Sequence, residues 1–321
     1  MKRLLLFVTL LFSVAAAWAQ VAEGDVSISC SWGELSATLA VPEAGSDTAV
    51  LIVAGSGPTD RNGNSSLNLN TYCYKLLSDG LVREGYAVMR YDKRAIGRSR
   101  IAPESIPNLV FDDFVDDAVA AVEHLRAEGY KRVFIAGHSE GGLIALVVAN
   151  RGVAVDGLVL LAAPGYAMDE ILRTQLRAQL MPQYMALMLQ TEMILRSLKE
   201  GKPYPDDKIA KELLSLFHSS VQPFLISCMQ YNPQLLAAKV ECPMFVVCGG
   251  HDIQVSSDNG EAIVKSAPNA ELRVFENMTH VLKDWPTEDR MEQLVNIYVN
   301  SQLPLTDGLV SAVSQFIKTT K

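Results

Sequence analysis

The feature that most constrains the fold is a regular alternation of short apolar runs with stretches that have helical spacing. The run at residues 49–54 is apolar at every position, which is typical of a strand buried on both faces of a parallel sheet. Strand-like and helical segments then alternate along the chain, with helices expected at 72–83, 111–128 and 141–150 and strands at 86–91, 132–136 and 158–162. Strands separated by helices predict a mostly parallel sheet.

The alternation is preceded by a different pattern and is resumed near the carboxyl end. Residues 26–30 and 35–41 alternate in polarity around Trp32 and Gly33, which predicts an antiparallel hairpin. The later part of the chain again combines strand-like and helical segments, with strands expected at 244–248 and 272–275 and helices at 258–265, 287–298 and 309–317.

A long segment between these two parts interrupts the alternation. Residues 168–238 contain no strand pattern and are rich in Leu, Met and Gln at helical spacing. We therefore expect a single α/β core made of residues 20–165 and 241–321, with a helical cap insertion at residues 166–240.

The amino terminus has the composition of a targeting segment. Lys2 and Arg3 precede an apolar stretch at residues 4–17, and Ala17-Trp18-Ala19 is typical of a cleavage site. A membrane anchor is the alternative, but the apolar run is shorter than the ~20 residues that a span needs. The sequence therefore predicts a signal peptide at residues 1–19 and an exported protein, periplasmic or extracellular, with no stable membrane span after cleavage.

Charge and cysteine content exclude two classes of function. The chain carries 28 Lys and Arg against 36 Asp and Glu, a net charge of −8, with no basic block suited to a phosphate backbone, so a nucleic acid is not the expected partner. The cysteines are odd in number, so at least one is expected to be unpaired, and they form no Cys-x-x-Cys motif or Cys/His cluster that would indicate a metal site: Cys30, Cys73, Cys228, Cys242 and Cys248.

The strongest indication of chemistry is the segment Gly-His-Ser-Glu-Gly at residues 137–141, which matches the pattern G-x-S-x-G. The match is more specific than the pattern alone, because a predicted strand ends just before it and a predicted helix begins with it. Glycines on both sides allow the tight, strained turn that exposes a nucleophile, here Ser139. The alternative is an ordinary glycine-rich turn between a strand and a helix.

A serine hydroxyl needs a base, and the chain has five histidines: His124, His138, His218, His251 and His280. Three of them are less suitable by position, since one lies inside an amphipathic helix, one beside Ser139 and one in the insertion. His280 lies in a loop just past a predicted strand, which makes it the expected base, with His251 as its rival.

The expected acid is Asp252, in the loop that follows the predicted strand at 244–248. The chain order is then Ser139, Asp252 and His280, with all three at the carboxyl edge of one sheet. Rival acids of lower weight are Asp258, Glu276 and Asp284. Two backbone N–H groups are expected to stabilise an oxyanion, those of Glu140 and of Ser56 in the Gly-Ser-Gly-Pro turn at 55–58, with Gly57 as the fallback.

Two further groups of residues have two interpretations each. Charged residues near the predicted site either bind an anionic substrate group or brace neighbouring loops, and bracing is favoured: Asp60, Arg61 and Arg94. Methionines of the insertion form either a pliable acyl pocket or the core of the cap: Met181, Met185, Met188 and Met193.

At these residues the chain resembles the α/β-hydrolase superfamily, over about residues 26–317. Residues 55–64 (GSGPTDRNGN) and 91–99 (YDKRAIGRS) are similar to exported bacterial carboxylesterases grouped with serine aminopeptidase and monoglyceride lipase-like hydrolases. The resemblance implies an eight-stranded, mostly parallel sheet and hydrolysis through an acyl-enzyme without cofactor or metal. Two departures are Ala54, where many relatives have His, and Ala95, where relatives often have glycine.

The sequence therefore predicts a serine carboxylesterase that acts on small-molecule esters, with Ser139 as nucleophile. An aminopeptidase or amidase with the same triad is the nearest alternative, and its substrate amine would need an acidic anchor: Glu140, Glu170 or Asp169. A non-catalytic binding protein of the same fold is a weaker alternative. Dehalogenase and epoxide-hydrolase activities are disfavoured because those relatives have an Asp at the nucleophile position.

Overall fold

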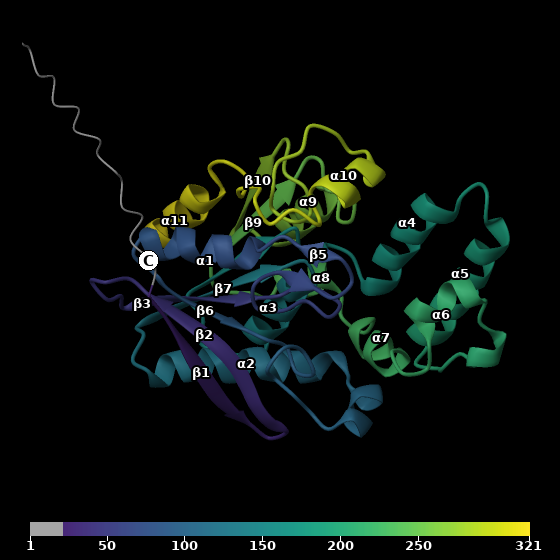
Figure 1. The fold of residues 1–321 in the computed structure, drawn as a ribbon, viewed down its shortest axis with the longest axis horizontal. Coiled ribbons are helices and arrows are strands. Elements are labelled where there is room, and N and C mark those ends of the chain that lie inside the picture. The colour runs from purple at the N-terminus through teal and green to yellow at the C-terminus, as the bar shows by residue number, and fades with distance from the viewer. Residues whose placement is uncertain (1–21) are drawn as a thin grey trace, which may run out of the picture.

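The computed structural model describes residues 22–321, so the predicted signal peptide at residues 1–19 lies outside the described residues. One sheet of eight strands runs through the molecule in the order β1-β2-β6-β3-β7-β8-β9-β10 (Figure 1). Its strands are β1 (Ala22–Cys30), β2 (Gly33–Val41), β3 (Thr48–Val53), β6 (Ala87–Tyr91), β7 (Arg132–His138), β8 (Gly157–Leu161), β9 (Met244–Gly249) and β10 (Ala270–Phe275).

The pairing of the strands follows the sequence prediction. The predicted hairpin is β1 and β2, which pair antiparallel with Cys30 opposite Gly33. β2 is also antiparallel to β6, and all remaining neighbours in the sheet pair parallel. A separate two-stranded sheet, β4 (Asn64–Ser65) with β5 (Leu69–Asn70), follows β3 in the chain.

Helices cover both faces of the large sheet. One face packs against α2 (Phe111–Ala127), α3 (Glu140–Asn150) and α9 (Asp258–Ser266), and the other against α1 (Cys73–Arg83) and α11 (Leu309–Thr319). The predicted helix at 287–298 is shorter in the structure, where α10 (Arg290–Asn296) begins after Asp289, whose carboxylate accepts the Glu292 N–H.

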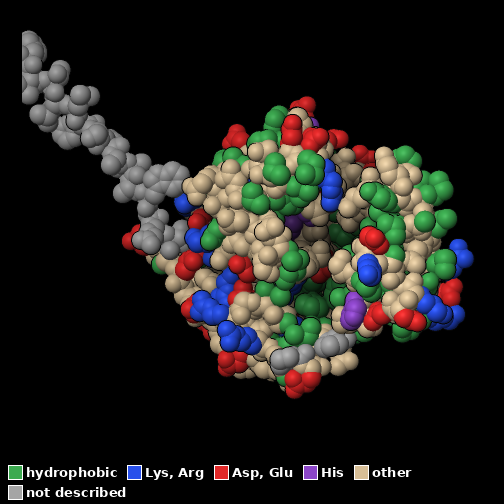
Figure 2. Space-filling model, turned by 45° about the vertical axis from the view of Figure 1, so that its right-hand side comes forward, with side chains coloured by type: hydrophobic (Ala, Val, Ile, Leu, Met, Phe, Trp, Pro, Cys, Tyr) green, Lys and Arg blue, Asp and Glu red, His purple; other side chains and the backbone are tan. Residues whose placement is uncertain are grey.

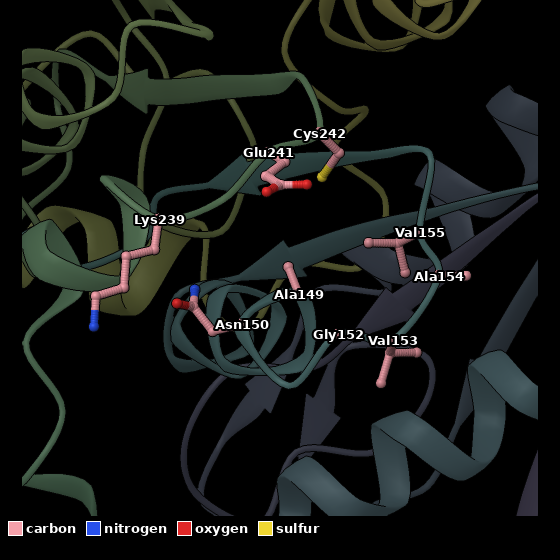
Figure 3. Close-up of a pocket in the computed structure, with 9 residues that line it drawn as sticks. All are labelled: Ala149, Asn150, Gly152, Val153, Ala154, Val155, Lys239, Glu241 and Cys242. Carbon is pink, nitrogen blue, oxygen red and sulfur yellow. The ribbon is translucent and has the colours of Figure 1, made fainter.

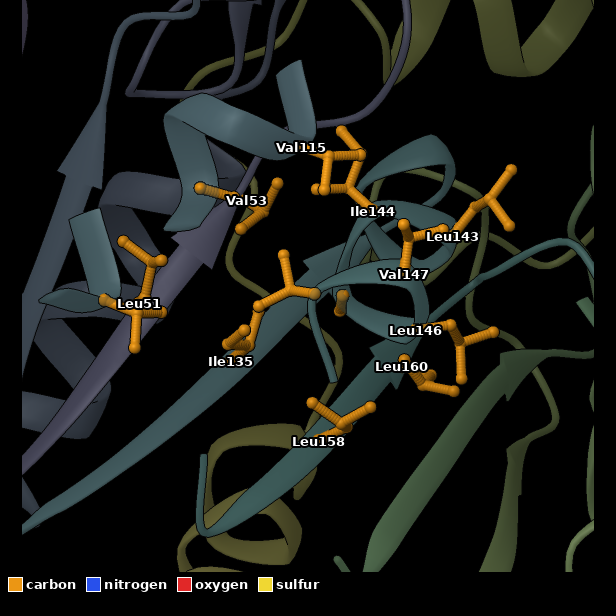
Figure 4. Close-up of a cluster of buried hydrophobic side chains, with 14 of the residues drawn as sticks. Leu51, Val53, Val115, Ile135, Leu143, Ile144, Leu146, Val147, Leu158 and Leu160 are labelled. Carbon is orange, nitrogen blue, oxygen red and sulfur yellow. The ribbon is translucent and has the colours of Figure 1, made fainter. Parts of the chain in front are cut away.

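The continuous apolar runs in the sequence are explained by this two-sided burial. In β3, Leu51 and Val53 join the hydrophobic cluster on the α2–α3 face, whereas Val50 and Ile52 join the cluster on the α1–α11 face. Figure 4 shows the first of these clusters, in which side chains of β3, β7 and β8 meet those of α3. Because successive side chains of a strand point to opposite faces, a strand covered on both sides needs apolar residues throughout.

The segment without strand pattern is helical, as predicted. It contains α4 (Met168–Leu180), α5 (Met185–Lys199), the short turn η2 (Asp206–Lys208), α6 (Lys211–Phe217), α7 (Gln222–Cys228) and α8 (Pro233–Ala237). Helices α4 to α6 project to one side of the sheet (Figure 1), and together with α7 they form a separate hydrophobic cluster. Of the methionines in this segment, Met188 is buried, whereas Met185 and Met193 are exposed and so do not belong to the core of the cap.

The two ends of the insertion meet at one residue. The N–H of Gly165, just before the insertion, donates to the side chain of Asn259 at 3.0 Å. Its carbonyl accepts a hydrogen bond of 3.1 Å from Gln234 in α8, close to the end of the insertion. A Cβ atom at Gly165 would lie 2.0 Å from the Asn259 carbonyl oxygen, so this junction requires glycine.

The described residues contain neither a disulfide nor a cluster of metal ligands. All five cysteines are free thiols, and residues 22–321 contain no group of three or more His, Cys, Asp or Glu side chains arranged to hold a metal ion. Among the same residues, none of the helices has the length and apolarity needed to cross a membrane.

The charged residues near the predicted site brace the loops. Arg61 is buried and pairs with Asp92 at 2.7 Å. Arg94 is buried and pairs with Asp117 at 2.7 Å and with Asp113 at 2.9 Å. Asp60 accepts backbone N–H groups within its own turn.

The buried position of Arg94 predicts that its replacement lowers the free energy of unfolding far more than replacement of an exposed, paired arginine. Arg94→Met leaves the Asp117 carboxylate buried without its cation, so the free energy of unfolding should fall by about 3–5 kcal/mol. Arg98→Met is the matched control, since Arg98 pairs with Asp25 at an exposed position, 64% and 62% exposed respectively, and should change stability little. Urea unfolding of both variants measures the difference in the free energy of unfolding. Equal losses in the two variants would contradict a buried, bracing role for Arg94.

Candidate active site

The elbow between β7 and α3 holds Ser139 in a strained conformation. Its backbone has φ 52° and ψ −121°, in the positive-φ region that side-chain-bearing residues rarely adopt. A Cβ at Gly137 would lie 2.2 Å from the Gly141 carbonyl oxygen, and one at Gly141 would lie 2.2 Å from that of Val53. Both glycines are therefore required by close backbone contacts, as the sequence pattern predicted.

Asp252 and His280 are brought together by two loops that pack closely. Asp252 follows β9, and His280 follows β10, its parallel neighbour in the sheet. A Cβ at Gly249 would lie 2.1 Å from the Met278 carbonyl oxygen, so the glycine at the end of β9 allows the loops to touch. The Asp252 carboxylate lies 2.8 Å from His280 Nδ1, with its other oxygen accepting backbone N–H groups at 2.8 and 2.9 Å.

This arrangement leaves one nitrogen of His280 free for chemistry. With Nδ1 bound to Asp252, the unprotonated nitrogen of the neutral ring is Nε2, the atom that can accept a proton. The Ser139 hydroxyl forms no hydrogen bond with the described residues 22–321, and catalytic hydrogen bonds are often loose before substrate binds. Ser139, Asp252 and His280 are 9%, 9% and 5% exposed.

The rival residues are engaged elsewhere. His251 Nδ1 donates to the Trp285 carbonyl at 2.6 Å, so it is not directed at Ser139. Asp258 accepts from Ser256, Asp284 accepts from Thr306, and Glu276 is exposed. The geometry thus pairs His280 with Asp252 and with none of the alternatives.

The turn after β3 lies directly against the elbow. A Cβ at Gly55 would be 3.1 Å from Ser139 Cβ. The N–H groups of Ser56 and Glu140 have no backbone or side-chain acceptor in the described part of the chain, and Glu140 begins α3, where N–H groups are free and the helix dipole favours negative charge. Both expected oxyanion donors are therefore open.

A buried lysine beside this turn, Lys93, was not found by sequence reasoning. Lys93 Nζ donates to the carbonyl oxygens of Gly55 and Gly57 at 2.6 and 2.8 Å. Burial lowers the pKa of Lys93, and the nearby Glu140 raises it in part. Burial raises the pKa of the Glu140 carboxyl, and Lys93 opposes this. A lysine two residues after the strand predicted at 86–91 was the available signal that a charge would be buried here.

Pockets occur both near this site and far from it. The pocket of about 440 Å³ in Figure 3 lies at the amino ends of β8 and β9, at the edge of the sheet opposite Ser139. Another of about 440 Å³ lies between α4 and the Asp252 loop, lined by Gln175, Gln179 and Ile253. Figure 2 shows a hollow between the body of the molecule and the projecting helices, with histidine atoms at its floor.

Comparison with known proteins identifies the family of the chain. A family model described as serine aminopeptidase, S33, matches residues 68–283, which is more than half of the chain. The chain belongs to this hydrolase family. Esterase EstD of Thermotoga maritima is 27% identical to this S33 family member over 265 residues, which make up 81% of the chain and 60% of EstD. The chain thus spans less than two thirds of that relative.

Solved structures similar to this S33 family member show its fold. The Pyrococcus furiosus esterase Pf2001 has a TM-score of 0.58 and 21% identity, covering 94% of this chain and 91% of that protein. Est1E of Butyrivibrio proteoclasticus, solved with ferulic acid bound, has a TM-score of 0.58 and 17% identity, covering 92% of this chain and 98% of Est1E. The expected α/β-hydrolase fold, with its mostly parallel eight-stranded sheet, is confirmed.

The buried His138 predicts an acid-dependent loss of stability. Burial and the neighbouring His280 lower the pKa of His138 from 6.5 to about 3, so below pH 6.5 the unfolded chain binds a proton that the folded protein does not. This contribution is complete above pH 6.5 and is lost as the pH falls towards 3. Relative to His138→Gln, the wild type should lose on the order of 2 kcal/mol between pH 7 and pH 4.5.

Urea unfolding of both proteins across this range measures the effect. The comparison with His138→Gln removes the contributions of other acidic and basic groups, which both proteins share. Parallel stability profiles for the two proteins would contradict the low pKa of His138.

Proposed function

We propose that this S33 family hydrolase is a serine carboxylesterase that cleaves small-molecule esters through an acyl-enzyme on Ser139. The observation that carries the proposal is the combination of a nucleophile held at positive φ with the 2.8 Å bond between Asp252 and His280 at the same edge of the sheet. The open N–H groups of Ser56 and Glu140 beside Ser139 support it further.

The mechanism follows from the direction of these groups. His280 Nε2 takes the proton of Ser139 as the hydroxyl oxygen attacks the ester carbonyl, and the N–H groups of Ser56 and Glu140 stabilise the oxyanion. His280 then gives the proton to the leaving alcohol, and Asp252 stabilises the transient imidazolium through Nδ1–H. A water molecule, deprotonated by His280, hydrolyses the acyl-enzyme and restores Ser139.

The surroundings of the acidic residues favour an ester over a peptide substrate. An aminopeptidase needs a free carboxylate for the substrate amine, but Asp169 already binds Lys199 at 2.9 Å. Glu140 is buried beside Lys93, and burial raises the pKa of its carboxyl. Only Glu170 among the three expected anchors is exposed, at a small pocket of about 220 Å³ that Tyr166 and Thr174 also line.

The triad is tested by removing its nucleophile and its base. Ser139→Ala and His280→Ala should each lower kcat for a p-nitrophenyl ester by about 10⁴- to 10⁶-fold, because the residual rate comes from binding and the oxyanion donors alone. Ser311→Ala is a matched control on the exposed side of α11 and should retain full turnover. Near-normal turnover in a folded Ser139→Ala protein would refute the proposal.

The substrate class is tested by comparing leaving groups on one enzyme. We expect kcat/KM for p-nitrophenyl esters to exceed that for aminoacyl p-nitroanilides, because Asp169 is already paired with Lys199 and burial raises the pKa of Glu140, which disfavours the charged carboxylate that a substrate amine needs. Higher kcat/KM for the anilides, reduced by Glu170→Gln, would instead identify an aminopeptidase with Glu170 as its anchor.

A further inference from the structure

A continuous chain of hydrogen bonds connects the turn at residues 55–58 to the loop that holds His280. The Gly55 N–H donates to the Tyr74 hydroxyl oxygen at 3.0 Å, and this hydroxyl lies 2.7 Å from His138 Nδ1. On its other side, His138 Nε2 lies 2.7 Å from the carbonyl oxygen of His280. These hydrogen bonds thus connect four separate parts of the protein: the turn after β3, helix α1, the elbow and the loop after β10.

The direction of each bond follows from the chemistry of the two ends. The His280 carbonyl can only accept, so His138 Nε2 must carry the proton, and Nδ1 of the neutral ring is then an acceptor. The Tyr74 hydroxyl therefore donates to Nδ1 and accepts the Gly55 N–H. Burial raises the pKa of Tyr74 and lowers that of His138, which keeps both in the protonation states that this direction requires.

We propose that Tyr74 and His138 are positioning residues of the hydrolase, which hold the Ser56 N–H and the His280 imidazole at a set separation on either side of Ser139. The inference rests on the proposed function, since it concerns the same nucleophile. Neither residue touches the substrate; each acts through the backbone of Gly55 or of His280.

Lys93 completes the constraint on the turn. The carbonyl of Gly55 and the N–H of Ser56 belong to the same peptide group and point in opposite directions across its plane. Because Lys93 Nζ binds that carbonyl at 2.6 Å, the Ser56 N–H is directed away from Lys93. Tyr74 holds the preceding N–H, so the turn is held at both sides of Gly55, and that N–H is not free to act as an oxyanion donor.

The packing around His138 leaves little room for other arrangements. The centre of its ring lies 5.5 Å from that of Tyr74, in an edge-to-face contact, and 4.9 Å from that of His280. A Cβ at Gly55 would lie 3.1 Å from His138 Nδ1. A tyrosine from helix α1 thus supplies side-chain support to this turn.

The test compares two tyrosine hydroxyls that both bind buried backbone groups. Tyr74→Phe removes the bond to Gly55, whereas Tyr86→Phe removes a bond of 3.1 Å to the Ser314 carbonyl, away from the site. Both should lose a similar amount of stability, as measured by urea unfolding. Only Tyr74→Phe should lower kcat for a p-nitrophenyl ester, by about 10- to 100-fold, with KM unchanged, because the misplaced donor acts on the transition state.

A second pair of variants tests the histidine. His138→Phe keeps a flat ring without polar atoms and should lower kcat as Tyr74→Phe does. His138→Gln offers an amide oxygen to Tyr74 and an amide N–H to the His280 carbonyl, so it should recover a large part of kcat. Circular dichroism checks that each variant is folded.

The rate of Ser139 labelling by a fluorophosphonate probe is measured on all variants, because it does not depend on the substrate class. Slower labelling of Tyr74→Phe and His138→Phe, with wild-type rates for Tyr86→Phe, supports the positioning role. Wild-type kcat and labelling in Tyr74→Phe, or an equal loss in Tyr86→Phe, overturns it. A wild type that is labelled at Ser139 but does not turn over esters refutes the esterase proposal alone, and the labelling rates then decide the inference. A wild type that is not labelled refutes both.

Discussion

The close contact between backbone segments around the elbow is the constraint on which the rest of the site depends. Gly137 and Gly141 let strand β7, helix α3 and the end of β3 approach to distances that any side chain would prevent. Ser139 is left at positive φ in the space between them, and its own N–H is bonded to the Leu161 carbonyl of β8 at 2.8 Å. The apolar core on both faces supplies the stabilisation that keeps this strained residue in place.

Around this fixed point the site is assembled from backbone contacts more than from side chains. The Gly249 contact brings the Asp252 loop to the His280 loop, and the Gly55 contact brings the turn at residues 55–58 to Ser139. Polar side chains such as Lys93 and Tyr74 then bind the backbone groups that these approaches leave buried, as buried polar groups require. The side chains that bind these buried carbonyl and N–H groups thereby also orient the backbone that carries the N–H proposed to act on substrate.

The sequence predicted those parts of the molecule that depend on local pattern. Strand β3 and the elbow were identified because their residues carry the signal themselves, either as an unbroken apolar run or as glycines flanking a serine. Asp252 and His280 followed from their positions behind successive strands. Tyr74 and Lys93 could not be assigned in this way, because their partners lie 19 and 38 positions away and depend on how α1 and the loop after β6 pack. The burial of the individual methionines in α5 was also not predicted, since helical spacing alone does not tell which side meets the core.

The junction at Gly165 has a consequence for how proteins of this design diversify. Because the beginning and the end of the insertion are tied to the same glycine, the whole segment enters and leaves the core at nearly one point. Its replacement by a shorter, longer or differently folded segment would need no change in the spacing of β8 and β9. The insertion can therefore evolve, or be exchanged between homologues by recombination, as an independent unit while Ser139, Asp252 and His280 keep their geometry.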